Sequence, residues 1–159
     1  MQRLATCVLV PLALAACGGS SAGGGSASTP VPTPTPTAAP VGQPMQELAS
    51  SGVTGTVLVM KGSGSFTVTL RIKGLVANSN HVNHIHRGSC PGSPGPIATD
   101  VISALLPLVA DAFGNASSTT MVPHEFVLAA EGWYANIHAG PDLQGANAKS
   151  ISCGNLQAA

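Results

Sequence analysis

The alternation of apolar and polar residues in Ser65–Lys73 limits the fold more than any other feature of the chain. Apolar Phe, Val, Leu and Ile occupy every second position, with Thr, Arg and Lys among the residues between them. Successive side chains of a β-strand point to opposite faces of its sheet, so this pattern predicts a strand with one buried face. A second run, Val53–Met60, precedes it, and the Lys-Gly-Ser-Gly segment between them is typical of a turn. The two runs therefore predict a β-hairpin.

Further short runs of β-branched and apolar residues follow, separated by Gly, Asn, Ser and Pro, which favour turns. They bring the expected number of strands to about seven, which suits an all-β Greek-key barrel or sandwich. Val101–Val109 is apolar enough for a short helix, but Pro107 would end a helix there, so we expect a loop with one helical turn. The further strands are expected at His81–His86, Ser118–Val122, Glu125–Ala129, Trp133–His138 and Ser150–Leu156.

The N-terminal part of the chain is typical of a targeting signal. Leu4–Ala16 is apolar, is broken by Pro11 and is shorter than the roughly 20 residues that cross a bilayer. It ends in Leu-Ala-Ala-Cys-Gly around Cys17, which resembles the bacterial lipobox. The resemblance implies that residues 1–16 are removed and that Cys17 carries lipid. We therefore expect an extracytoplasmic protein that contacts a bacterial membrane only through its lipid anchor.

The composition then changes to Gly, Ser and Ala and afterwards to Thr-Pro repeats, up to Pro44. Such a segment cannot form a packed core, and its second half favours the extended polyproline II conformation. We expect residues 17–44 to be a tether and residues 45–159 to form the folded domain. Because charged residues make up only 8% of the chain and the six basic residues balance the six acidic ones, we expect no nucleic-acid partner.

The histidines are the main candidates for chemistry. On a strand, His84 and His86 would lie on the same face about 6.5–7 Å apart, while Ile85 would point into the core. His138 lies in another expected strand and could supply a third imidazole if the two strands are neighbours. Imidazole suits copper and zinc, and copper binds more tightly. The alternative is that the two histidines are surface residues that share this spacing by chance.

Cys90 and Cys153 are the cysteines that remain in the chain after Cys17. An even pair in an exported domain predicts a disulfide. It would close a loop of about 60 residues and join the segment after the histidine pair to the last expected strand. The alternative is a zinc site in which two thiolates join the histidines.

The run His81-Val-Asn-His84-Ile-His86 resembles the His-x-x-His-x-His run of the Cu,Zn superoxide dismutases, in which a loop with a Cys also follows. Gly132, six residues before His138, and Ser-Cys-Gly around Cys153 resemble further segments of that family. The resemblance covers about residues 53–156 and implies a Greek-key barrel of about eight strands. It further implies that His84, His86 and His138 bind copper, that His81 is a structural histidine and that Cys90 pairs with Cys153.

The chain also departs from that family. Asp111 resembles a zinc ligand, but no histidine stands between Cys90 and Asp111, so we expect copper as the cofactor and no zinc. Ser150 occupies the place of the active-site Arg, and the neighbouring Lys149 is expected to attract superoxide as a point charge. His124 has no counterpart in the family, and we expect it on the surface.

A second resemblance leads to a different function. Gly132-Trp-Tyr-Ala-Asn-Ile-His138, together with His84-Ile-His86 and the later Gly95-Pro-Ile97, is similar to segments of the chordin-type CHRD domain, a β module with no established chemistry. Two hypotheses therefore remain. The first is a copper-binding protein that dismutates superoxide, or acts on another small molecule, and the second is a binding module without catalysis.

Overall fold

The computed structural model describes residues 39–90 and 101–159, which are all-β apart from one 3₁₀ helix, η1 at Gly145–Ala148. No helix among these residues is long and apolar enough to span a membrane. The strands are β1 Gln43–Glu47, β2 Thr54–Lys61, β3 Phe66–Lys73, β4 Asn80–His81, β5 Asn83–Arg87, β6 Val101–Ala104, β7 Leu108–Val109, β8 Ala116–Val122, β9 Trp133–His138 and β10 Ser150–Asn155.

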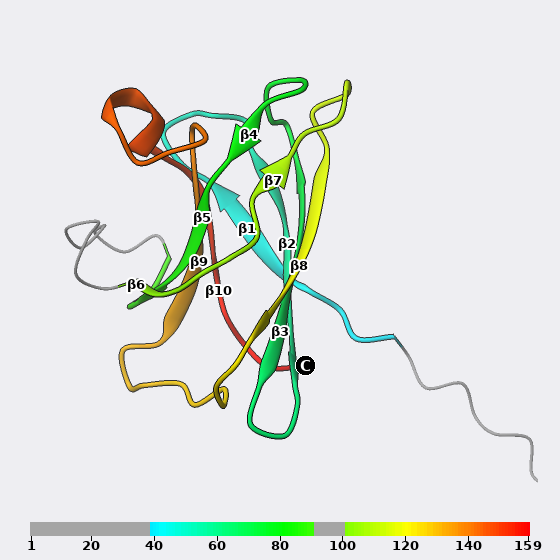
Figure 1. Ribbon diagram of the computed structural model, residues 1–159, viewed down its shortest axis with the longest axis vertical. Coiled ribbons are helices and arrows are strands. Elements are labelled where there is room, and N and C mark those ends of the chain that lie inside the picture. Colours follow the sequence, from blue (N-terminus) through cyan, green and yellow to red (C-terminus); the bar gives the residue numbers. More distant parts are fainter. Residues whose placement is uncertain (1–38, 91–100) are drawn as a thin grey trace, which may run out of the picture. The chain divides into compact units, whose positions relative to one another are not determined.

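Eight of these strands form one antiparallel sheet in the order β6-β5-β9-β10-β1-β2-β3-β8. The sheet curves into a nearly closed barrel, and β4 and β7 form a small second sheet beside it (Figure 1). The predicted all-β barrel is therefore confirmed. Because β5, β9 and β10 are consecutive in the sheet, they bring the segments with the histidine pair, His138 and Cys153 next to one another.

The predicted hairpin is present. Val59 of β2 lies opposite Val68 of β3, and every second residue of β3 from Phe66 to Ile72 is buried. The turn between the strands is closed by a hydrogen bond from the amide of Gly62 to the carbonyl of Ser65. The alternation in the sequence thus specifies which face of β3 points inward.

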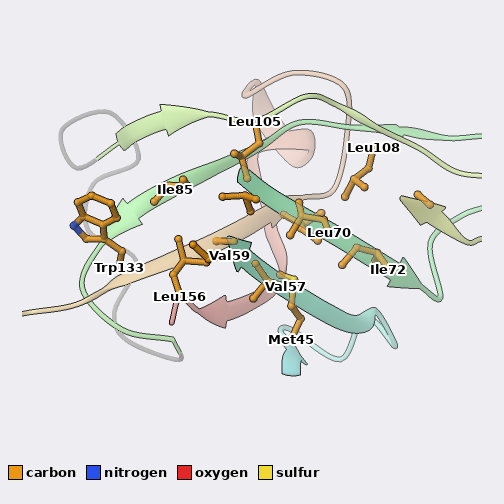
Figure 2. Packing of buried hydrophobic residues seen from close by; sticks show 14 of the residues in the cluster. Met45, Val57, Val59, Leu70, Ile72, Ile85, Leu105, Leu108, Trp133 and Leu156 are labelled. Atoms are coloured by element: carbon orange, nitrogen blue, oxygen red, sulfur yellow. The ribbon is translucent and has the colours of Figure 1, made fainter. Parts of the chain in front are cut away.

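The buried face of the hairpin belongs to a continuous hydrophobic core. Figure 2 shows its side chains gathered between the strands, with Trp133 toward one end and Ile72 toward the other. Ile85 of β5 and Ile137 of β9 are fully buried in it. Burial of a side chain of this size stabilises the fold by about 1.5–3 kcal/mol, so the core holds β5 and β9 with their other faces turned away from it.

Two predictions about individual segments are wrong. Glu125–Ala129 is not a strand, because it pairs with no other strand in the described part of the chain. Only Phe126 in it is buried, against Phe66 and Trp133. Val101–Val109 is not a loop with a helical turn but contains β6 and β7, which pair with β5 and β4. Whether each segment forms a strand therefore depends on the presence of a partner strand and not on local propensity.

The remaining differences concern boundaries. β1 begins at Gln43, inside the segment expected to be the tether, because residues 43–45 pair with β2. The single strand expected over His81–His86 is divided at Val82 into β4 and β5. The expected signal and the lipidated Cys17 lie outside the described residues.

Candidate metal centre

The pairing of β5 with β9 places polar side chains on one face of the sheet. His84 lies directly opposite Asn136, and His86 lies opposite Tyr134. Ile85 is fully buried in the core, as the sequence predicts for the residue between two histidines that share a face. Neighbours on this face have Cβ atoms only about 4.5–5.5 Å apart, which brings their ring atoms close together.

His138 joins the pair from the end of β9. Its backbone amide donates a hydrogen bond of 3.0 Å to the carbonyl of Val82, which places it beside the start of β5. The ring centroid of His138 is 5.4 Å from that of His84 and 6.5 Å from that of His86. One ring nitrogen of each histidine lies within 4.8 Å of the others, so the three residues can hold a metal ion.

The hydrogen bonds of His138 select its ligand atom. Nδ1 lies 2.8 Å from the carbonyl oxygen of Ala148, which can only accept, so Nδ1 carries the proton and donates it. The lone pair is therefore on Nε2, which is the nitrogen that remains for a metal ion. A backbone carbonyl that fixes the tautomer in this way is a common feature of histidines that bind metals.

The protein favours the neutral forms of His84 and His138, because it lowers the pKa of both imidazoles. Burial, followed by the charge of His138, lowers the pKa of His84. Burial also lowers the pKa of His138, although its hydrogen bond to Ala148 acts in the opposite direction. Neutral imidazole is the form that binds a metal ion. In addition, Nδ1 of His84 is buried and has no hydrogen-bond partner among the described residues, so it is available to bind a metal ion.

His81 does not belong to the cluster of three. It is buried on β4, where its Nδ1 lies 2.8 Å from the carbonyl oxygen of His138 and its Nε2 lies 2.6 Å from the hydroxyl of Ser79. These contacts join β4 to the end of β9. His81 therefore supports the backbone at His138 rather than offering a nitrogen to the site.

The predicted disulfide between Cys90 and Cys153 is confirmed. Cys153 lies on β10 directly opposite Asn136, and Tyr134 packs in one buried cluster with both cysteines. The ring of Tyr134 stacks on His86 with the centroids 5.3 Å apart. The disulfide and this tyrosine thus form one wall of the site.

Other residues considered from the sequence lie outside the cluster of three. Lys149 is exposed and lies between Ala148, which binds His138, and Ser150. Asp111 is exposed and its carboxylate accepts hydrogen bonds from the amides of Phe113 and Asn115, within its own turn. His124 is exposed, as expected, and its ring packs against Phe66.

Asn136 contacts the candidate metal centre, although no sequence motif singles it out as a site residue. Its Nδ2 lies 3.2 Å from Nε2 of His138 and 2.8 Å from the hydroxyl of Ser150. The signal is present in the sequence, because Asn136 stands two positions before His138 in an expected strand and so shares its face.

Comparisons with protein-family models and with curated proteins give no match for this chain. Its chemistry is therefore inferred from the geometry of these side chains.

Proposed function

We propose that this chain binds one copper ion through His84, His86 and His138 and dismutates superoxide outside the cytoplasm, with a lipid anchor at Cys17. The observation that carries the proposal is the convergence of three imidazole nitrogens within 4.8 Å. A donor set made of imidazoles suits copper and zinc, and copper forms the tighter complexes with a given site.

The sequence supports a single metal ion. No histidine stands between Cys90 and Asp111, and the carboxylate of Asp111 is occupied by the amides of its own turn. Copper supplies a one-electron couple, which oxidises one superoxide to oxygen and reduces the next, with two protons, to hydrogen peroxide. Three imidazoles leave coordination positions free for the small substrate.

The chain's own residues bind and orient in this proposal. His84 is only half-buried, whereas His86 and His138 are buried, so superoxide approaches from the side of His84. Lys149 is exposed next to Ser150 and attracts the anion locally, because the nearly neutral chain exerts little attraction over longer distances. The protons for hydrogen peroxide come from water.

The first test is metal content and stability. The full chain, purified in detergent, is loaded with copper and zinc and desalted, and we expect about one copper and little zinc per chain. At free copper of about 100 times Kd, binding stabilises the native state by about 2.7 kcal/mol, which raises Tm by about 10 °C. His84→Ala and His138→Ala should lose this shift and the exposed control His124→Ala should keep it. A wild-type chain that retains no metal would refute the proposal.

The second test concerns the reaction. Copper-loaded protein should accelerate the decay of superoxide, and His138→Ala should not. Lys149→Gln should lower the rate a few-fold and weaken its dependence on ionic strength, because salt screens a local charge of this kind. Decay at the background rate with fully loaded wild-type protein would contradict dismutation and leave copper binding intact.

A second candidate function is a binding module without a metal. It is favoured by the contact of 3.2 Å between the amide of Asn136 and Nε2 of His138, which satisfies the buried imidazole without an ion. A Tm that does not change when copper or zinc is added would select this alternative, because a ligand that binds only the native state must stabilise it.

A further inference from the structure

The carboxamide of Asn136 lies against His138 of the candidate metal centre. Asn136 is 4% exposed, lies directly opposite His84 on β5 and stands two residues before His138 on the same strand. Its Nδ2 contacts His138 at 3.2 Å and Ser150 at 2.8 Å. Its Oδ1 is buried and has no hydrogen-bond partner among the described residues. The NH2 group of this buried amide therefore has hydrogen-bond partners, whereas its oxygen has none among the described residues.

This orientation of the amide is incompatible with a metal ion on Nε2 of His138. The NH2 group donates to Nε2 of His138, which is the atom that carries the lone pair for a metal ion. A metal ion bound there would lie beside the positive end of the amide dipole, and the hydrogen bond would be lost. Carboxamide oxygen and nitrogen have nearly the same size, so a half-turn of the group exchanges their positions without new steric contacts.

Ser150 can form a hydrogen bond with the amide of Asn136 in either orientation. The hydroxyl of Ser150 now accepts a hydrogen bond from Nδ2 at 2.8 Å, and it can equally donate one to an oxygen in the same place. After a half-turn, Oδ1 would stand where Nδ2 stands, 3.2 Å from Nε2 of His138. Two atoms bound to one ion at about 2.0–2.1 Å in tetrahedral geometry are about 3.3–3.4 Å apart. The position therefore matches that of a further donor atom.

We propose that Asn136 is a fourth metal ligand, whose carboxamide turns over on metal binding so that Oδ1 faces the ion and accepts a hydrogen bond from Ser150. This inference rests on the proposed function in that it requires an ion at the three histidines. It adds one oxygen donor to three nitrogens. Because oxygen donors prefer divalent ions to the softer Cu(I), Asn136 favours Cu(II) and Zn(II).

The test compares two substitutions in the full chain. Asn136→Leu keeps the number of side-chain heavy atoms and removes both polar atoms, and Asn136→Asp keeps an oxygen donor. We expect Asn136→Leu to raise Kd for Cu(II) at least tenfold, with a smaller effect on Cu(I), and to change the electron paramagnetic resonance spectrum of bound Cu(II). Asn136→Asp should retain Cu(II) binding. The matched control is Asn83→Leu, because Asn83 is also buried on this sheet but donates to the carbonyl of Leu106.

A measurement on the wild-type chain covers the case in which the variants do not fold. On titration with Zn(II), the side-chain NH2 signals of Asn136 should shift more in the nuclear magnetic resonance spectrum than those of Asn83. If wild-type protein takes up neither ion, the proposed function fails together with this inference. If it binds Cu(II) but Asn136→Leu has the same Kd and spectrum, or if it binds Zn(II) and the NH2 signals of Asn136 do not move, only this inference fails.

Discussion

Removal of the disulfide between Cys90 and Cys153 is the sharpest test of how the site is held. The bond joins residues 63 positions apart, and its loss lets the unfolded chain explore many more conformations. The chain-entropy relation gives a destabilisation of about 4 kcal/mol for a loop of this length. For the compact unit of residues 37–159, this corresponds to a fall in Tm of about 15 °C.

The assay is urea denaturation of the oxidised wild-type chain and of the double variant Cys90→Ala/Cys153→Ala. The free energy of unfolding should fall by about 4 kcal/mol, and the m-value should rise because the unfolded chain without the cross-link exposes more surface. Wild-type protein treated with a reductant serves as the control and should show the same loss. A difference below about 1 kcal/mol with an unchanged m-value would refute the entropic argument.

The same variant should also weaken copper binding at the candidate metal centre. Tyr134 packs against both cysteines and stacks on His86, so the wall of the site depends on the cross-link. We expect the double variant to bind copper more weakly than wild type at a temperature where both are folded. Equal copper affinity in the two proteins would show that the three imidazoles are positioned by the sheet alone.

Three further predictions concern the fold. Gly114→Ala should destabilise the protein by more than about 2 kcal/mol in thermal denaturation, because Gly114 has φ of +77° and a Cβ there would collide with backbone. The control Gly64→Ala has φ of +68° but lies in open space, so it should cost about 1 kcal/mol. Phe66→Ala should cost about 3–5 kcal/mol in urea denaturation and Phe113→Ala, at an 88% exposed position, less than about 0.5 kcal/mol. Hydrogen bonds lower the pKa of Asp111, so its stabilisation is present above about pH 4 and lost as pH falls further, and the stability gap to Asp111→Ala should close there.

Part of the site could be predicted because it depends on local geometry. His84 and His86 share a face since a strand has a period of two, and Ile85 therefore enters the core. The position of His138 beside them depends on the pairing of β5 with β9. A family resemblance suggests this pairing, but no local pattern in the sequence specifies it.

Other parts could not be predicted from local patterns. The proton on Nδ1 of His138 follows from the carbonyl of Ala148, which is the last residue of η1. The role of Asn136 follows from its contact with Ser150 of the neighbouring strand β10. Glu125–Ala129 and Val101–Val109 were misassigned for the same reason, since a strand forms only where another strand offers its backbone.

The sequence by itself determined the class of fold, the buried face of the hairpin, the shared face of the histidine pair and the composition of the disulfide. These properties follow from the period of side chains along a single strand and from the number of available cysteines. Only the tertiary structure decided which strands are neighbours, as shown by the pairing of Gln46 in β1 with Cys153 in β10. The assembly of the candidate metal centre belongs to this second group, because its three histidines come from β5 and β9, which meet only when these two strands pair.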